Sequence, residues 1–535
     1  MLESTLAVEF DDRRIDAIFA DLDQCRLPGA AVGIAIGGKP VYRKGFGLAS
    51  MELPVILGPS MRMRIGSTTK HFTSLAYLLL CEEGKASLDD ALGQYLPELH
   101  PVGRGVTVRQ LMGHRSGLRD AYDISWLFDG MEGRVSSAEL LSLYRTIDDV
   151  SAAPGSEWSY NNGGYLLLSA IIERIADRSL DEVLRERICF PVGMHDTLLR
   201  RSDTDFVPNS ATLHTNRPVG GFYKAQLGTD FSGEGGLVST VDDMLRWLAH
   251  MDAPIIGSEG TWQALKTPLR LDNGYLTDYG LGLVISNYRA AVIISHAGGV
   301  MGGNSQMLKV PAAGLDITVM VNRSDVLGME RVNKILDACL PGLAPVEQIA
   351  GERSAFSGVY RSPRTGRVIE MFEKGGQQAI SMDGYELPFE SDCAGKMRPV
   401  PAWSSIKQTI AWVHGAEEPR QISLDDHGNI DELQAVEPST TANVAGITGG
   451  YAAEAIRTRV TIEETAAGPR LRTRGPFGSS AVFDLQYLGD RLWKAKSTGS
   501  VPWGAILSFA TDGHSFRFSS ARTRALVFRR DIDRA

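Results

Sequence analysis

Cysteine is scarce in this chain, and it has neither long apolar runs nor an excess of basic charge. Its 535 residues include five cysteines, an odd number without a CxxC pair, so a disulfide framework is not expected. No apolar run is long enough to span a membrane, and the N-terminus lacks a signal-peptide pattern. The formal net charge of −9 argues against nucleic acid as a partner. We therefore expect a cytoplasmic protein with no membrane or nucleic-acid partner.

Metal-binding motifs are also missing. The sequence has no HExxH motif and no cluster of cysteine and histidine, so we expect no metal and no other cofactor. The chain is instead long and 43% hydrophobic, which is enough to bury a large core without disulfide bonds or a structural metal ion. Length alone therefore predicts several domains.

The sequence pattern changes character at two points. Residues 1 to about 340 mix helical and strand patterns, and a proline-containing stretch then leads into short alternating strands. A second change comes at residues 437–446, and residues 356–376 faintly echo residues 447–468. Each later part is about the length of a small antiparallel barrel. The predicted domains are 1–340, 341–445 and 446–535.

Within the first domain, local patterns predict the elements that carry the candidate site. Apolar residues at helical spacing predict a helix from Ser67 to Glu83, with Gly84 as its stop. Short apolar runs between glycines across residues 279–321 predict antiparallel strands of one sheet.

The S-x-x-K sequence from Ser67 to Lys70 is the first candidate catalytic element. A serine at a helix start faces free backbone N–H groups, and a lysine three residues later lies on the same face. A partly desolvated lysine has a lowered pKa and accepts the serine proton, as acyl transfer requires. Taken alone, the motif is more often a helix-capping serine beside a solvated lysine.

A Y-x-N motif, Tyr160 to Asn162, lies between a Pro154-Gly155 turn and an apolar helix. A tyrosine at a helix entry can relay a proton to a leaving nitrogen, and Asn162 can hold a substrate amide. The competing interpretation is a capping turn in which Tyr160 packs into the core.

The third element is His296-Ala297-Gly298-Gly299, at the end of an apolar run. Glycines at a strand edge allow a substrate backbone to approach closely. Backbone N–H groups of this segment can complete an oxyanion hole with the N–H of Ser67. Taken alone, His296 is more often a structural histidine than a catalytic one.

Together and in this order, the three motifs resemble those of the penicillin-recognising serine hydrolase superfamily, the serine beta-lactamase-like enzymes. Residues 111–118 (LMGHRSGL) are similar to the family motif LLxHTSGL, and residues 235–240 (GGLVST) are similar to GGLxST. The resemblance covers about residues 25–325.

The resemblance implies a multidomain fold. It consists of an α/β beta-lactamase-like catalytic domain, an antiparallel sheet flanked by helices, followed by two antiparallel β-barrel domains. It also implies that Ser67 is the nucleophile, Lys70 its base and Tyr160 the proton relay. The substrate-binding and oxyanion residues that it implies are Asn162, His296, Gly298 and Gly299.

Within the superfamily, the chain is similar to the D-aminopeptidase branch, which has H-x-G where lactamases carry K-T-G or K-S-G. That branch appends two eight-stranded barrels, and its third domain sends a loop into the active site. The comparable loop is 475–484, with Phe477, Ala481 and Asp484 as candidate specificity residues. Ala481 stands where the branch has an aspartate for the substrate amino group, and Asp484 is the candidate replacement.

The expected substrate is therefore a small peptide, amide or ester. The first interpretation is an aminopeptidase or amidase that releases N-terminal D-residues. The second is a carboxylesterase, because acyl-serine chemistry is shared and the amine-binding aspartate is missing. A third, of another class, is a catalytically silent protein that binds ligands with its barrels. A homodimer is left open as the assembly.

Overall fold

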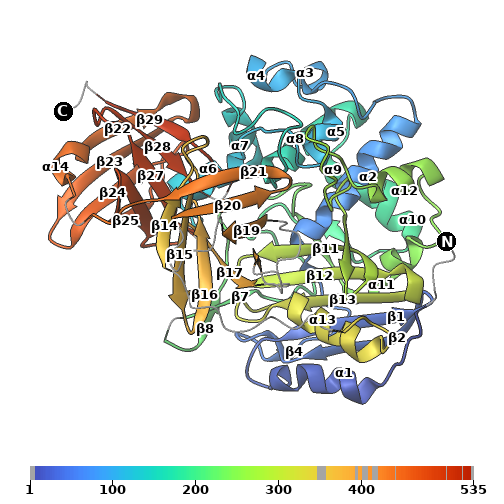
Figure 1. The fold of residues 1–535 in the computed structure, drawn as a ribbon. Coiled ribbons are helices and arrows are strands. Elements are labelled where there is room, and N and C mark those ends of the chain that lie inside the picture. The colour runs from blue at the N-terminus through green and yellow to red at the C-terminus, as the bar shows by residue number, and fades with distance from the viewer. Residues whose placement is uncertain are drawn as a thin grey trace.

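The computed structural model describes most of the chain (Figure 1). The described residues are 6–217, 219–345, 357–391, 396–399, 408–412, 420–439, 442–501, 503–520 and 522–531. They form one mixed α/β unit, which contains the first described residues, followed by two β-barrels that lie together on one side of it, at the left in Figure 1.

A six-stranded antiparallel sheet forms the centre of the α/β unit. In sheet order its strands are β10 (Val284–Tyr288), β11 (Ala291–Val300), β12 (Gly303–Val310), β13 (Leu315–Val321), β1 (Ala30–Ile36) and β2 (Lys39–Phe46). Strand β1 pairs with both β2 and β13. The β1–β2 hairpin, which comes first in the sequence, therefore continues the sheet that β10 to β13 form. The prediction of antiparallel strands across residues 279–321 is confirmed.

Both faces of the sheet are buried, which explains the continuous apolar sequence of β1. Ala31 and Ala35 face one apolar core, and Val32 and Ile34 face the other. Helices α1 (Asp12–Phe19) and α13 (Gly328–Cys339) cover the second face, and α11 (Val241–His250) covers the first. At Gly33 a Cβ would lie 2.9 Å from the Leu245 side chain, so a glycine here lets α11 approach the strand closely.

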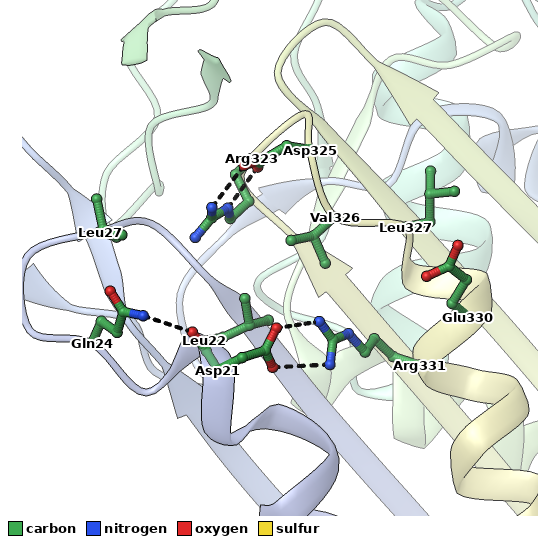
Figure 2. A pocket seen from close by; sticks show the side chains of 10 residues that line it. All are labelled: Asp21, Leu22, Gln24, Leu27, Arg323, Asp325, Val326, Leu327, Glu330 and Arg331. Carbon is green, nitrogen blue, oxygen red and sulfur yellow. Dashed lines mark hydrogen bonds and ion pairs between the residues drawn. The ribbon is translucent and has the colours of Figure 1, made fainter. Parts of the chain in front are cut away.

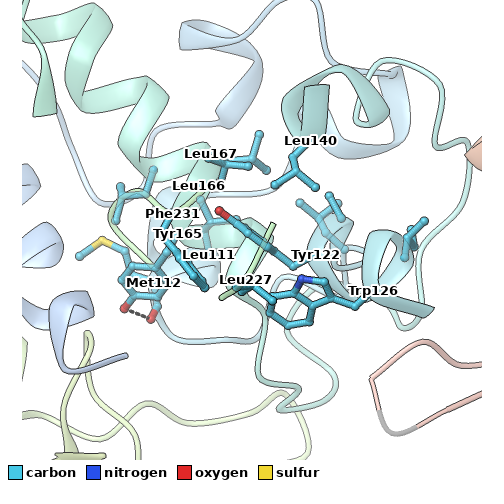
Figure 3. Close-up of a cluster of buried hydrophobic side chains, with 14 of the residues drawn as sticks. Leu111, Met112, Tyr122, Trp126, Leu140, Tyr165, Leu166, Leu167, Leu227 and Phe231 are labelled. Carbon is cyan, nitrogen blue, oxygen red and sulfur yellow. Dashed lines mark hydrogen bonds between the residues drawn. The ribbon is translucent and has the colours of Figure 1, made fainter. Parts of the chain in front are cut away.

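The chain between β2 and β10 folds into a mostly helical layer on the first face. Its helices pack around a cluster that includes Leu111, Tyr122, Tyr165 and Phe231 (Figure 3). The helices are α2 (Thr69–Glu82), α3 (Leu92–Tyr95), α4 (Pro101–Arg104), α5 (Val108–Met112), α6 (Ala121–Asp129), α7 (Ser137–Leu143), α8 (Asn162–Ala176), α9 (Leu180–Leu184), α10 (Phe190–Val192) and α12 (Glu259–Lys266). Short strands between them are β3 (Leu48–Ser50), β4 (Val55–Ile56), β5 (Met63–Arg64), β6 (Leu198–Leu199), β7 (His214–Asn216), β8 (Phe222–Lys224) and β9 (Leu237–Ser239).

The helix predicted from Ser67 to Glu83 differs slightly at its start. The turn Gly66–Thr68 is a 3₁₀ turn, and the α-helix α2 begins at Thr69. It ends at Glu82, close to Gly84, whose φ of +69° glycine adopts easily. Ser67 therefore lies on the tight turn that enters the helix.

Two closed eight-stranded barrels follow the α/β unit, and the predicted fold class is confirmed. The strands of the first barrel are β14 (Gly358–Arg361), β15 (Val368–Lys374), β16 (Gln377–Met382), β17 (Tyr385–Ser391), β18 (Met397–Pro399), β19 (Gln408–Trp412), β20 (Gln421–Asp426) and β21 (Asn429–Ala435). Those of the second are β22 (Gly449–Ala453), β23 (Thr458–Thr465), β24 (Gly468–Arg474), β25 (Val482–Gly489), β26 (Leu492–Ser497), β27 (Ala505–Phe509), β28 (Ser515–Ser519) and β29 (Leu526–Arg530).

The exact domain boundaries stay a prediction. The first boundary, predicted between residues 340 and 341, directly follows helix α13, and residues 346–356 beyond it lie outside the described residues. Helix α14 (Val444–Ile447) spans the second predicted boundary and packs with the core of the second barrel.

The two barrels differ in how they join the α/β unit. Phe518 and Phe528 of the second barrel pack against Phe128 of α6, with ring centroids 4.9 and 5.5 Å away. These residues belong to the same apolar cluster as the helical layer. The first barrel instead encloses a cluster of its own, around residues such as Ile410 and Leu424. The second barrel is therefore built onto the α/β unit through a shared core.

Candidate active site

Backbone contact with the central sheet fixes the turn that carries Ser67. Gly66 has a φ of +52°, and a Cβ on it would lie 3.1 Å from the backbone of Gly298 in β11. A Cβ on Gly298 would in turn collide with the backbone just before the turn. The Thr68 hydroxyl adds a hydrogen bond of 3.1 Å to a β11 carbonyl. The S-x-x-K and H-x-G motifs are therefore brought together, with the Ser67 side chain half-buried between them.

Lys70, the second residue of α2, is completely buried. Its Nζ lies 2.8 Å from Asn162 Oδ1, 2.6 Å from the Glu234 carbonyl oxygen and 3.2 Å from Ser67 Oγ. Burial lowers the pKa of Lys70 to about 7, although the Glu234 carboxylate opposes that shift. In the neutral amine, two protons are donated to the two carbonyl oxygens, so the lone pair is left to accept the Ser67 proton.

Tyr160 lies directly before α8, and its ring lies 4.7 Å from Lys70 Nζ and 4.2 Å from the ring of His114. Burial raises the pKa of the Tyr160 hydroxyl, and the Ser67 side chain and the Arg522 charge offset this only in part. The hydroxyl makes no hydrogen bond of normal geometry within the described residues. It therefore keeps its proton at neutral pH and is free to donate it.

A directed chain of hydrogen bonds links two buried histidines through Tyr279. The N–H of Asn161 donates to His114 Nδ1 at 3.1 Å, which leaves the ring proton on Nε2, 3.2 Å from the Tyr279 hydroxyl. That hydroxyl lies 3.0 Å from His296 Nε2, and His296 Nδ1 lies 2.7 Å from the Ala297 carbonyl oxygen. The network thus assigns His296 an Nδ1–H tautomer whose Nε2 accepts from Tyr279.

Burial lowers the pKa of His296 to about 3 and that of His114 well below its ordinary value. The nearby Lys70 charge acts in the same direction on both rings. His296 is therefore neutral at physiological pH and shapes the site without exchanging protons. Tyr279, which sequence reasoning missed, is the residue that fixes its orientation.

Asn162 fixes the position of Lys70. Its Oδ1 accepts the Lys70 hydrogen bond, and its own backbone N–H donates to Asp120 at 2.8 Å. The Asp120 carboxylate also accepts the N–H of Gly163 at 3.0 Å, so it caps the start of α8. In the described part of the chain, the Asn162 amide nitrogen donates no hydrogen bond, which leaves it free for a substrate carbonyl.

Loop 475–484, predicted to enter the active site, packs against the end of α6. Asp129 there accepts the N–H groups of Phe477 at 3.2 Å and Ser479 at 3.0 Å. The Arg457 guanidinium lies 5.9 Å from the Phe477 ring. Among the described residues, no hydrogen bond, ion pair or ring contact joins this loop to the three catalytic candidates.

The two remaining loop candidates are also engaged elsewhere. Ala481 is buried, and its N–H donates to the Thr473 hydroxyl at 2.6 Å. Asp484 lies in β25, where strand alternation turns it outward, and it forms an exposed ion pair of 2.8 Å with Arg470. Within the described residues Asp484 is therefore paired with Arg470 and contacts none of the catalytic candidates, and its replacement of an amine-binding aspartate stays a prediction.

The second barrel does reach the catalytic centre, but through other loops. Arg522, between β28 and β29, places its guanidinium carbon 5.1 Å from the centroid of the Tyr160 ring and 6.0 Å from that of Trp503. The Trp503 ring lies 6.1 Å from Trp126 of α6 and 6.4 Å from Tyr385 of the first barrel. Both barrels thus contribute side chains to the rim of the site, and no motif in the sequence marks them.

The first barrel also supports the segment that leads to Tyr160. Asn429 donates a hydrogen bond of 3.2 Å to the Ser156 carbonyl oxygen, and the His427 ring lies 5.1 Å from the ring of Trp158. The hairpin between β20 and β21 therefore packs against the approach to the Y-x-N motif.

A pocket of about 320 Å³ lies elsewhere, between the end of α1 and the start of α13 (Figure 2). Four of its five charged residues already pair with one another, Arg331 with Asp21 at 2.6 Å and Arg323 with Asp325 at 2.7 Å. The catalytic candidates do not line it.

Comparison with known proteins identifies the family. The Beta-lactamase family model matches residues 15–340, more than half of the chain. This chain belongs to the beta-lactamase family. The predicted superfamily is thereby confirmed, and the matched range contains all three motifs.

Curated relatives in this family include D-aminopeptidases. Those of Brucella melitensis biotype 1 and Brucella anthropi are 26% and 27% identical, over 468 and 477 residues. The two alignments cover 87% of this chain and 87% and 86% of the relatives. The predicted enzyme class, a serine hydrolase, agrees with these relatives.

Solved structures show the same fold. The octameric penicillin-binding protein homologue from Pyrococcus abyssi is 22% identical with a TM-score of 0.58, covering 79% of this chain and all of that one. A D-amino acid amidase from Ochrobactrum anthropi SV3 is 23% identical with a TM-score of 0.52, covering 61% and 97% of the two chains. None of the helices in the described ranges combines the length and apolarity that a bilayer crossing requires.

Proposed function

We propose that this protein hydrolyses peptides or amides with an N-terminal D-residue through an acyl-enzyme on Ser67. The observation that carries the proposal is the buried Lys70, whose Nζ lies 3.2 Å from Ser67 Oγ and whose pKa is lowered to about 7. Such an amine is poised to accept the serine proton. The D-configuration rests on the names of the D-aminopeptidase relatives.

Acylation begins when Ser67 Oγ attacks the substrate carbonyl carbon and its proton moves to Lys70 Nζ. The C–N bond then breaks, and Tyr160 gives its proton to the departing amine nitrogen. The resulting tyrosinate recovers a proton from the Lys70 ammonium, which lies against the same ring. Because burial raises the pKa of Tyr160, this residue serves as the proton donor and Lys70 as the acceptor.

The N–H groups of Ser67 and Gly299 are the oxyanion donors in this proposal. Val300 and Gly303 are the last paired residues before the turn between β11 and β12. Because hydrogen-bonded and non-hydrogen-bonded pairs alternate along antiparallel strands, the N–H of the adjacent Gly299 points away from β12. Open space surrounds the position where a Cβ on Gly299 would lie. Each such donor is worth roughly 3–4 kcal/mol of transition-state stabilisation.

Deacylation reverses the relay. A water molecule attacks the acyl carbon and gives a proton to Tyr160 Oη as the Tyr160 proton moves to Lys70 Nζ, and Ser67 Oγ then leaves with the proton that the Lys70 ammonium returns. The free acid is released and the neutral amine is restored, so the cycle needs no cofactor.

The other two interpretations have less support. A carboxylesterase would use the same centre, but the relatives described above are named D-aminopeptidases. Burial of Lys70 lowers its pKa, and this desolvation costs folding stability. A silent binding protein has no need of such a lysine beside a serine hydroxyl, whereas acyl transfer does.

Paired assays test the proposal. We expect kcat/KM for D-alanine p-nitroanilide to exceed that for the L-isomer at least tenfold, and a fluorophosphonate probe to label native protein at Ser67. Faster turnover of phenyl acetate with no turnover of either anilide would favour the esterase. Failure of the probe to label Ser67 would favour the silent binder.

Assembly and location remain proposals. A homodimer is the assembly that we propose for testing by light scattering on a sizing column. A cytoplasmic location is to be tested by cell fractionation.

A further inference from the structure

A guanidinium from the second barrel faces the catalytic centre. Arg522 lies over the ring of Tyr160, with its guanidinium carbon 5.1 Å from the ring centroid. The same ring centroid lies 4.7 Å from the Nζ of Lys70. A single aromatic ring therefore connects this cation with the catalytic base, although the two come from different parts of the chain.

Three buried polar groups around this position lack hydrogen bonds within the described residues. They are Arg522 Nη1, Asp123 Oδ1 and the Tyr160 hydroxyl. Arg522 Nη1 and Asp123 Oδ1 lie 3.9 Å apart, which is too far for a hydrogen bond. Because buried polar groups in folded proteins nearly always have partners, this cluster indicates a group that the substrate supplies.

The other arginine of the same loop provides a comparison. Arg524 pairs with Glu157 at 2.7 Å and approaches Asp426 at 3.5 Å, so it ties the loop to both the α/β unit and the first barrel. Among the described residues, Arg522 has one ion pair, with Asp123, and that pair is 3.9 Å long. Arg524 therefore anchors the loop, and the Arg522 guanidinium is available to bind a group of the substrate.

The charge that a substrate can reach here is positive. The Arg522 side chain is 31% exposed although its Nη1 is buried, whereas the Asp123 side chain is completely buried. Burial raises the pKa of Asp123 to about 7 against the pull of Arg522, so near neutral pH it neutralises the guanidinium only in part. A substrate ammonium would meet a like charge, and a carboxylate would meet the planar fork that fits it best.

We propose that Arg522 is a specificity-determining residue that binds a carboxylate of the substrate. The preferred substrates are then peptides or amides that carry a carboxylate near the scissile bond, rather than those whose only charge is a free α-ammonium. This inference rests on the proposed function, because it names the substrate class of the same site.

Two matched substrate pairs test it on either side of the scissile bond. D-alanyl-D-alanine against D-alanyl-D-alaninamide places or removes a carboxylate on the leaving group. N-succinyl against N-acetyl D-alanine p-nitroanilide does so on the acyl group. We expect at least one pair to show a tenfold or greater preference in kcat/KM for the carboxylate, and the preference to shrink as salt is added.

Variants assign the preference to Arg522. Arg522→Gln should bring the ratio of kcat/KM within each pair to about threefold or less, and Arg522→Lys should keep part of the preference for the carboxylate. Arg517→Gln, the same change at an exposed position of β28, should leave the ratio unchanged. If Arg522→Gln does not fold because Asp123 loses its counter-charge, the double variant Arg522→Gln/Asp123→Asn removes both charges. Equal rates within both pairs for the native enzyme, or a preference that survives Arg522→Gln or the double variant, would overturn the inference.

Failure of the proposed function would look different. In that case no D-substrate of either pair would be hydrolysed, whatever its charge. Failure of the inference alone leaves turnover intact and removes only the difference between pair members.

Discussion

The catalytic centre and its rim are built in different ways. At the centre, Lys70 has three contacts within 3.2 Å, all from the α/β unit. At the rim, Arg522 and Trp503 come from the second barrel and Tyr385 from the first, and the Arg522 guanidinium makes no hydrogen bond among the described residues. In our proposal, therefore, the α/β unit performs the chemistry, and the barrels decide which substrates it accepts.

The two barrels also differ from each other. The second shares a continuous core with α6, whereas the first encloses its own core and reaches the α/β unit through hairpins. Loss of residues 446–535 would therefore expose a large apolar surface on the α/β unit. Point variants at the rim are a cleaner way to separate selectivity from stability.

The largest expected effect is at the nucleophile. Ser67→Ala removes the attacking oxygen, so kcat/KM for every substrate should fall by roughly 10⁴-fold or more. Because Ser67 is half-buried in a short turn, the melting temperature should change little. Steady-state activity assays and thermal melts on the same preparation measure kcat/KM and the melting temperature. Residual activity of native size would place the nucleophile elsewhere.

The base should come next. Lys70→Met leaves an unactivated hydroxyl and should lower acylation by about 10²–10⁴-fold for all substrates alike. In the native enzyme, only the neutral amine accepts the serine proton. Since the pKa of Lys70 is lowered to about 7, kcat/KM should rise about tenfold per pH unit below pH 7 and level off above it. A flat profile between pH 5 and 8 would contradict this assignment.

A smaller effect is expected at Tyr279. Tyr279→Phe leaves His296 Nε2 and His114 Nε2 without their buried partner, which should cost about 1–3 kcal/mol of stability and lower kcat about tenfold. Tyr77→Phe is the matched control, because this buried tyrosine loses a hydrogen bond of 2.8 Å to the Ser87 carbonyl oxygen and contacts neither histidine. Equal losses of kcat in the two variants would show that Tyr279 acts only through stability.

The smallest effects on selectivity are expected in loop 475–484. Ala481→Asp buries a carboxylate beside Thr473, so it should destabilise the protein while changing the preference between free and N-acetylated D-alanine anilides by less than threefold. Asp484→Asn breaks only an exposed ion pair and should change stability by about 0.5 kcal/mol or less. A large gain in free-amine preference for Ala481→Asp would show that this loop reaches the substrate.

The sequence made the centre predictable because its motifs are local. The spacing of Ser67 and Lys70 follows from one helical turn, and the glycines of the H-x-G motif follow from close backbone contact. The partners of Lys70 were harder to foresee, since the Glu234 contact uses a backbone oxygen.

The rim could not be predicted, because it depends on how separate domains dock. Nothing in the local pattern around Arg522 or Trp503 distinguishes it from an ordinary surface loop. Loop 475–484 was placed by resemblance, and its backbone N–H groups instead bind the buried Asp129 at the end of α6. Docking contacts between residues far apart in the chain leave no periodic signal in a single sequence.

The central claim is that catalysis proceeds through an acyl group on Ser67. Intact-protein mass spectrometry after rapid acid quench of a D-amino acid ester or amide reaction tests it directly. We expect a mass increase equal to the acyl group, mapped by proteolysis to the peptide that contains Ser67, and no increase in Ser67→Ala. Steady turnover with no adduct at any quench time, or an adduct on another residue, would contradict it.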